Sequence, residues 1–160
     1  MKIMFVCTGN ICRSPLAEAV FRQMADDAGV GGQFEIRSSG TTAYHVGQAA
    51  DERMRAVSAA HGVEIRNRSK QLTRSDIDGY DLILAMDRSN LREIGHIAGS
   101  SLPKDRVRLF REYDPQGGID SEVPDPYYGG QSGFEGVFAM VERTCAALLT
   151  TLRDLDAVAE

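Results

Sequence analysis

Residues 2–21 read KIMFVCTGNICRSPLAEAVF, and this stretch decides the fold. Its first residues, 2–6, form a short apolar run that a Thr-Gly-Asn turn ends, which predicts a buried strand. Ser14 and Pro15 then predict the start of a helix, because serine is a good N-cap and proline is favoured in the first helical turn. A strand that leads through a short loop into a helix is typical of α/β folds.

The rest of the chain continues this alternation. Apolar runs predict strands over residues 34–38, 80–86 and 107–110, and periodicity predicts helices over residues 48–61, 89–97 and 134–152, with a helical turn at 75–77. We therefore expect a single α/β domain over residues 1–160: a doubly wound, parallel four-stranded sheet with helices on both faces and a phosphate-binding loop after the first strand. The end of the chain, from about residue 154, is expected to fray.

The composition argues against several kinds of partner. The net charge is −5 at pH 7, so no general basic field exists to hold nucleic acid or anionic lipid. The apolar run at residues 3–6 is too short for a signal peptide, and no later segment approaches the roughly 18 apolar residues that a membrane span needs. These features predict a cytoplasmic protein with no membrane insertion, and they leave secretion without a signal peptide open.

The three cysteines, Cys7, Cys12 and Cys145, do not suggest a structural framework. An odd number argues against a set of structural disulfides. Cys7 and Cys12 are too far apart for a Cys-x2-4-Cys zinc knuckle, and no second pair of ligands follows. We expect free thiols, no metal and no cofactor.

The loop from Cys7 to Ser14 has the pattern Cys-x5-Arg. It lies where a doubly wound sheet places its ligands, and the N–H groups and dipole at a helix N-terminus favour an anion. Five intervening residues allow the loop to wrap around one tetrahedral oxyanion; Gly9 permits close approach or positive φ, and Asn10 tolerates a left-handed backbone. Arg13 offers a planar fork for two phosphate oxygens, and these features together favour a nucleophilic Cys7 thiolate. The alternative is a small buried cysteine beside a surface arginine.

A second motif, Asp125-Pro126-Tyr127-Tyr128, lies in a long loop over residues 114–133. A thiolate that attacks phosphorus needs an acid for the leaving group, because a phenol leaves far more easily once it is protonated. Asp125 is the candidate acid, Pro126 restricts it to an extended backbone, and the two tyrosines suit the flanks of an aromatic ring. The alternative is a plain Asp-Pro turn with solvent-facing tyrosines, in a loop that is only a surface excursion.

At these two motifs the chain resembles the low-molecular-weight protein tyrosine phosphatase family. Residues 6–18 are similar to the family's N-terminal signature and residues 125–129 to the motif that carries the family's general acid; Ser38, Tyr44 and residues 86–91 stand in family-like order between them. The resemblance covers nearly the whole chain. It implies hydrolysis of protein phosphotyrosine through a cysteinyl-phosphate, with phosphotyrosine-containing proteins as partners and inorganic phosphate or similar oxyanions as inhibitors.

The resemblance also implies a role for each site residue. Cys7 attacks phosphorus, Arg13 and the loop amides stabilise the transition state, and Asp125 protonates the phenol and then activates water. The substrate contacts are implied for Thr8, Gly9, Asn10, Ile11, Cys12, Ser14, Tyr44, Tyr127 and Tyr128, and Ser38 supports the loop together with Asn10 and Ser14. Cys12 is implied as the partner of Cys7 in a reversible disulfide, which is reasonable for an activated thiolate beside a second thiol.

One departure and three alternatives accompany this resemblance. Asn67 stands where family members often carry a histidine in the network that supports the loop, and asparagine cannot hold a proton charge. An arsenate reductase on the same fold needs further cysteines in a mobile segment, and residues 70–100 contain none. A protein arginine phosphatase tends to carry threonine where Ile11 stands, and the larger apolar side chain better suits a phenyl ring. A non-catalytic phosphate-binding module should have lost Cys7 or Asp125, and both are present.

Overall fold

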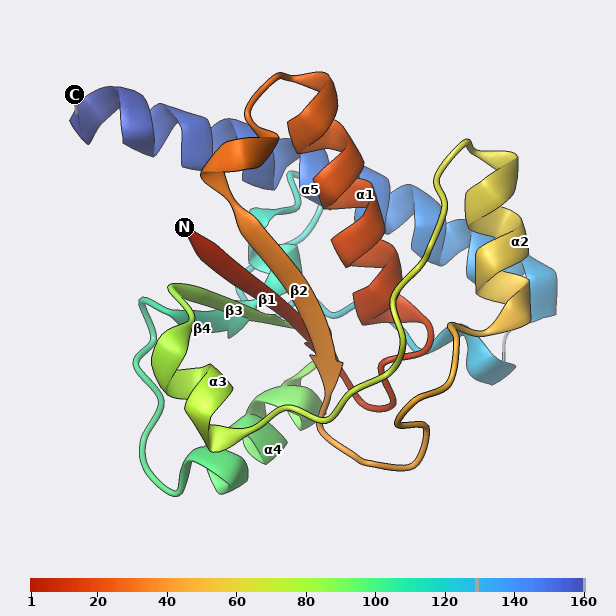
Figure 1. Cartoon of the computed structure of the whole chain (residues 1–160), viewed down its shortest axis with the longest axis horizontal. Coiled ribbons are helices and arrows are strands. Elements are labelled where there is room, and N and C mark those ends of the chain that lie inside the picture. The colour runs from red at the N-terminus through yellow and green to blue at the C-terminus, as the bar shows by residue number, and fades with distance from the viewer. Residues whose placement is uncertain (129, 160) are drawn as a thin grey trace.

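The computed structural model describes residues 1–128 and 130–159, and a parallel four-stranded sheet forms its centre (Figure 1). The strands are β1 (Lys2–Cys7), β2 (Glu35–Gly40), β3 (Leu82–Ala85) and β4 (Val107–Leu109), in the spatial order β2-β1-β3-β4. Each strand lies within two residues of its predicted bounds, and the predicted parallel sheet is confirmed.

Helices cover both faces of the sheet, and each face has its own apolar core. Successive side chains of β1 alternate between the faces, as the geometry of a strand requires. Ile3 and Phe5 belong to the larger core, and Met4 and Val6 to the smaller one. The larger core includes residues of α1 (Arg13–Asp27), α2 (Glu52–Ala60) and α5 (Gly130–Ala159), and the smaller includes residues of α3 (Arg74–Gly79) and α4 (Arg88–Ala98). Figure 1 shows α1 and α5 on the side of the sheet away from α3 and α4.

The first helix begins differently from the prediction. Cys12 takes the N-cap position without a capping side chain, and α1 starts at Arg13. Ser14 is therefore the second helical residue and not the N-cap. Its hydroxyl contacts the sulfur of Cys7 at 2.9 Å and so serves a tertiary contact that local capping preferences cannot reveal.

Two other helix starts are set by aspartates. Residues 48–61 were expected to be helical, but α2 begins only at Glu52, because the Asp51 side chain accepts hydrogen bonds from the amides of Arg53 and Met54. Similarly, α4 begins at Arg88, because Asp87 and not Ser89 or Asn90 is its N-cap.

The last helix is longer than expected, since α5 runs from Gly130 to Ala159 and not only over residues 134–152. The residues from 154 to 159, expected to fray, are thus helical, in keeping with the strong helix propensity of leucine and alanine in this segment. Three short 3-10 helices complete the fold: Gly31–Gln33, η2 (Phe110–Tyr113) and η3 (Pro126–Tyr128). Within residues 1–128 and 130–159, no helix is long and apolar enough to cross a membrane.

The fold places the carboxyl ends of its strands at one edge. β1 ends at Cys7, β2 at Gly40 and β3 at Ala85, and all three strands are parallel. The chain order reverses between β1 and its neighbours, since β2 lies on one side of β1 and β3 on the other. Ligands of open α/β sheets bind at such a switch point, so this edge is where a site is expected.

Candidate active site

Residues from both predicted motifs line one cavity of about 180 Å³ at this edge of the sheet. Its lining comprises Cys7, Thr8, Gly9, Ile11, Cys12, Arg13, Thr42, Tyr44, His45, Asp125 and Tyr127. Tyr44 and Tyr127 are 86% and 50% exposed, so they form an open rim. The side chain of Tyr128 lies outside the described residues. The fold thus brings Cys7 and Asp125, 118 positions apart, to the same cavity.

The loop after β1 has its carbonyl groups occupied and its amides free. Four of its carbonyl oxygens accept hydrogen bonds: that of Cys7 from Thr41 N, that of Thr8 from Thr42 N, that of Gly9 from Ser69 Oγ, and that of Ile11 from Asp51 N. By contrast, the backbone N–H groups of residues 8–12 donate to no acceptor in the described part of the chain. A run of unpaired amides beside a helix N-terminus is a binding site for an oxyanion.

Asn10 holds this loop in shape. Its φ is 56°, the only positive value of any described residue other than glycine, which confirms the left-handed conformation that the sequence suggested. Its amide nitrogen donates to Ser14 Oγ (2.8 Å) and Ser38 Oγ (3.0 Å), and its amide oxygen accepts from Lys70 N (3.0 Å). Because Asn10 is 1% exposed, these bonds are made in the dry interior, where they hold the loop firmly.

The supporting network extends beyond Ser38 to two further residues. Ser38 Oγ donates to Glu18, a buried acid on α1 that sequence reasoning missed. Asn67 donates to Ser38 Oγ at 3.2 Å, so it keeps a contact in the network, while its own amide oxygen is buried with no partner in the described part of the chain.

Close packing of the loop depends on two glycines. A Cβ atom on Gly40, at the end of β2, would lie 2.7 Å from the carbonyl oxygen of Thr8 and 3.0 Å from the amide of Asn10. A Cβ atom on Gly9 would lie 2.9 Å from the ring of His45. Gly9 therefore allows close approach and does not have a positive φ.

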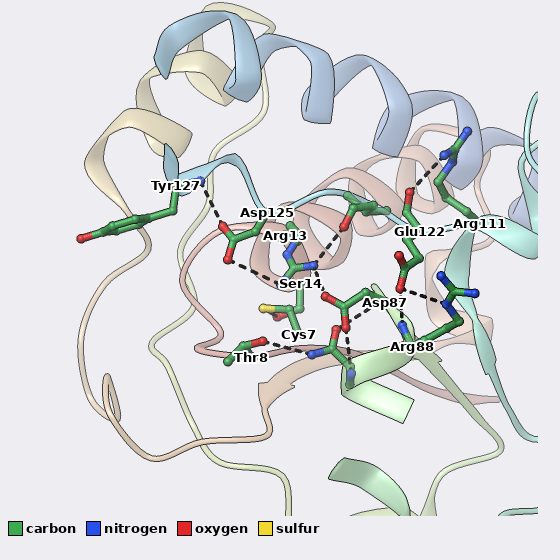
Figure 2. A network of polar contacts seen from close by, with 12 residues as sticks. Cys7, Thr8, Arg13, Ser14, Asp87, Arg88, Arg111, Glu122, Asp125 and Tyr127 are labelled. Atoms are coloured by element: carbon green, nitrogen blue, oxygen red, sulfur yellow. Dashed lines mark hydrogen bonds and ion pairs between the residues drawn. The ribbon is translucent and has the colours of Figure 1, made fainter. Parts of the chain in front are cut away.

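Arg13 is buried beneath the cavity and has two fixed partners. It is 3% exposed, and its Nη1 donates to the carbonyl oxygen of Val123 (2.9 Å) and to Asp87 Oδ2 (2.7 Å). Figure 2 shows the pair with Asp87. Burial alone would lower the pKa of Arg13, but Cys7, Asp87 and Asp125 raise it, so the guanidinium stays charged. Asp87 is a site residue that the sequence analysis did not single out, although an acid directly after a buried strand could have indicated it.

Asp125 lies at the mouth of the cavity. Its side chain is 53% exposed; Oδ1 accepts a hydrogen bond from Tyr127 N (3.0 Å), and Oδ2 lies 3.9 Å from Arg13 Nη2 (Figure 2). This carboxylate is thus accessible to a ligand in the cavity and to water. The geometry is suited to a group that exchanges protons with both.

The two cysteines of the loop differ in character. Cys7 Sγ contacts Ser14 Oγ at 2.9 Å at the entrance of the amide-rich loop. Burial, and then the charge of Asp51, raises the pKa of Cys12 to about 12, so Cys12 remains a thiol at neutral pH. Cys12 is therefore a poor nucleophile, and the cavity offers Cys7 for that role.

Cys145 is far from this chemistry. It lies on α5 with 0% exposure, and its thiol donates to the carbonyl oxygen of Ala17 in α1 at 3.7 Å. Burial raises the pKa of Cys145 well above its usual value, so it is an inert packing residue. Over residues 1–128 and 130–159, histidine, cysteine and acidic side chains form no cluster that could hold a metal ion.

The sequence matches the family model of the low molecular weight phosphotyrosine protein phosphatases over residues 2–157. The chain belongs to this family. It is 46% identical to a low molecular weight protein-tyrosine-phosphatase of Streptomyces coelicolor over 96% of this chain and 94% of that protein.

Solved phosphatase structures share the fold over nearly their whole length. A protein tyrosine phosphatase of Entamoeba histolytica superposes with a TM-score of 0.88 at 36% identity, covering 98% of this chain and 99% of that one. An arginine phosphatase of Drosophila superposes with a TM-score of 0.84 at 28% identity, over 95% and 98% of the two chains. The family scaffold thus carries more than one phosphatase specificity, and the side chains of the cavity have to decide between them.

Proposed function

We propose that this low molecular weight phosphatase hydrolyses phosphotyrosine in proteins by way of a cysteinyl-phosphate. One observation carries the proposal: a single cavity joins a thiol, a loop of unpaired amides, a buried arginine and an accessible carboxylate. Each is a part that phosphoryl transfer through a covalent intermediate requires.

In the first step, the Cys7 thiolate attacks phosphorus while the phosphate oxygens lie among the amides of residues 8–12. A sulfur–phosphorus bond forms, the bond from phosphorus to the phenolic oxygen breaks, and that oxygen takes a proton from Asp125. Because Asp87 and the Val123 carbonyl hold Nη1 of Arg13, the rest of the guanidinium is oriented to bind the phosphate oxygens. A thiolate can only accept, so the Ser14 hydroxyl, 2.9 Å from the sulfur, donates a hydrogen bond to it, which favours the thiolate as attacker and as leaving group.

In the second step, the ionised Asp125 takes a proton from water, and the water oxygen attacks phosphorus. The sulfur–phosphorus bond breaks, the Cys7 thiolate is restored, and inorganic phosphate leaves. The 53% exposure of Asp125 supports this second role, because water reaches the carboxylate without a conformational change. Inorganic phosphate fits the same amides, and we expect it to inhibit competitively.

The walls of the cavity favour an aromatic leaving group. Ile11, Tyr44 and Tyr127 all line it, and they present apolar and aromatic surface above the phosphate loop. Flat rings pack well between such side chains. We therefore propose phosphotyrosine-containing proteins as substrates. The three free thiols suit the reducing environment of the cytoplasm, where we place the protein.

The other specificities have weaker support. The Drosophila relative is an arginine phosphatase, but the Ile11 side chain offers no acceptor for a guanidinium. A disulfide-shuttling arsenate reductase would need a mobile third cysteine, whereas Cys145 is fully buried in α5.

A substrate panel tests the proposal. Phosphopeptides of one sequence carrying phosphotyrosine, phosphoserine or phosphoarginine should show hydrolysis of the phosphotyrosine form with at least a tenfold advantage in kcat/KM. Cys7→Ser should abolish turnover of all three and still bind inorganic phosphate. Preference for phosphoarginine, or full activity in the serine variant, would overturn the proposal.

A further inference from the structure

A buried ion cluster lies behind the loop that carries Asp125. Its centre is Asp114, directly after η2, whose side chain is 0% exposed. Oδ1 accepts hydrogen bonds from Arg143 Nε (2.8 Å) and Gln116 N (2.9 Å), and Oδ2 accepts from Arg143 Nη2 (2.9 Å) and Arg111 Nε (2.9 Å). These donors, Arg143 first among them, hold the pKa of Asp114 well below its usual range. The cluster therefore contains a permanent carboxylate with a fixed orientation.

Arg111 connects this cluster to the acid loop, by which we mean residues 122–125. While its Nε donates to Asp114, its Nη1 donates to the carbonyl oxygen of Glu122 at 3.0 Å (Figure 2). A guanidinium is planar and rigid, so anchoring Nε fixes the direction of Nη1. The Arg111 side chain is only 15% exposed, which leaves it little freedom to move.

The beginning of the acid loop is held from several sides. Next to Glu122, the amide of Val123 donates to the carbonyl oxygen of Met86 (2.8 Å), and the Val123 carbonyl accepts from Arg13. The Glu122 carboxylate accepts from the amide of Arg88 at 2.7 Å. Residues 122 and 123 are thus fixed to the residue after β3, the start of α4, the Asp114 cluster and the proposed phosphate-binding arginine.

Asp125 itself has few contacts of its own. It is half exposed and is held by the Tyr127 amide, with Arg13 at a distance of 3.9 Å. Its place over the cavity is therefore set by its neighbours in the chain: the anchored residues two and three positions before it, and η3 after it, which packs against α5. Arg111 provides a side-chain anchor that lies outside the cavity and touches neither Cys7 nor its loop.

We propose that Arg111, oriented by Asp114 and Arg143, is a positioning residue for the general acid. This inference rests on the proposed role of Asp125. Arg111 determines how well that carboxyl group reaches the leaving oxygen, whereas phosphate binding depends on the loop after β1. A misplacement of about 1 Å is enough to cost on the order of 10²-fold in rate.

The test compares two esters with different needs for an acid. Phenyl phosphate has a poor leaving group, whereas p-nitrophenyl phosphate releases a phenolate that is already stable. Arg111→Met should lower kcat/KM on phenyl phosphate by about 10- to 100-fold and on p-nitrophenyl phosphate by at most about fivefold, because kcat/KM reports the step that releases the phenol and not the later hydrolysis of the cysteinyl-phosphate, which both esters share. The inhibition constant of inorganic phosphate should be nearly unchanged. Asp125→Asn provides the reference pattern of selective loss.

The matched control is Arg108→Met. Like Arg111, Arg108 pairs with an acid, because its Nε donates to Glu112 Oε2 at 2.7 Å. Unlike Arg111, it makes no hydrogen bond or ion pair with the acid loop in the described part of the chain. Its rates on both esters should stay within about twofold of the wild type. If Arg111→Met does not fold, Arg111→Lys replaces it, because a single ammonium cannot reproduce the fork and should give a smaller selective loss.

The outcomes separate this inference from the proposed function. A loss in Arg111→Met that is equal on both esters, or no loss at all, with Asp125→Asn selective, overturns the positioning role alone. If Asp125→Asn itself shows no selectivity for the poor leaving group, both the acid assignment and the positioning role fall. Selective loss in Arg111→Met and Asp125→Asn, with Arg108→Met unaffected, supports both.

Discussion

Replacing Asn10 with alanine should destabilise the whole chain as well as the phosphate loop. The change removes three hydrogen bonds: two buried ones to Ser14 and Ser38, and a partly buried one from the amide of Lys70. At a net value of about 1 kcal/mol each, these contribute about 3 kcal/mol. The left-handed φ of 56° adds a further cost of about 1 kcal/mol for alanine. Since the chain's total stability is expected at about 5–15 kcal/mol, the variant should fold but be clearly weakened by about 4 kcal/mol.

Urea denaturation of a matched set isolates these contributions. Asn10→Gly lacks the same hydrogen bonds but accepts positive φ, so it should be about 1 kcal/mol more stable than Asn10→Ala. Asn67→Ala is the control within the same network, because it removes only one hydrogen bond, to Ser38, and should cost about 1 kcal/mol or less. Both Asn10 variants should also bind inorganic phosphate more weakly. An Asn10→Ala variant within about 1 kcal/mol of the wild type, with phosphate affinity unchanged, would refute the reasoning.

Three further changes give separate tests. Asp125→Asn should lower kcat/KM, which reports the step that releases the phenol, by about 10²–10⁴-fold on phenyl phosphate and much less on p-nitrophenyl phosphate, and equal losses in kcat/KM would remove Asp125 from the role of acid. After treatment with peroxide, a thiol reductant should restore the wild type but restore Cys12→Ser poorly, and equal recovery in both proteins would make Cys12 a packing residue. The pKa of Asp114 is lower in the folded protein than in the unfolded chain. Its carboxylate therefore stabilises the fold above the unfolded pKa of about 3.9, and this stabilisation is lost as the pH falls from there through the folded pKa. Asp114→Asn should therefore lower the free energy of unfolding by about 1.5–3 kcal/mol at neutral pH. The difference in free energy of unfolding between the variant and the wild type should narrow below about pH 4. A difference that stays constant down to about pH 2 would contradict this.

The sheet could be predicted because each strand is marked by a short run of neighbouring residues in the sequence. An apolar run such as residues 3–6 favours burial, and each run is followed by a helical pattern, so a parallel sheet was the natural expectation. Helix starts were less predictable where side chains serve tertiary contacts. Ser14 has the preference of an N-cap, yet the structure uses its hydroxyl for Cys7 and Asn10, an arrangement that depends on the closed loop.

The site was predictable where its residues are neighbours in sequence. The Cys-x5-Arg spacing is contained in one loop, and Asn10 has the left-handed backbone that this loop requires. Several residues contributed by other elements were missed. Asp87 follows β3 and His45 comes after β2, and the strand order brings both to the loop after β1. Glu18, on α1, joins the network only through its contact with Ser38 of β2. Likewise, nothing in the sequence around Arg111 indicates that it reaches the acid loop, because that contact spans eleven residues of irregular backbone.

Trapping the covalent intermediate tests the central claim most directly. The protein is mixed with radiolabelled p-nitrophenyl phosphate, denatured within milliseconds and digested, and the labelled peptide is sequenced by mass spectrometry. We predict labelled phosphate on the sulfur of Cys7. The labelled fraction should form and decay fast enough to account for the rate of turnover, and no label should be found in Cys7→Ser. Label on another residue, or continued turnover in Cys7→Ser without any labelled peptide, would contradict the account.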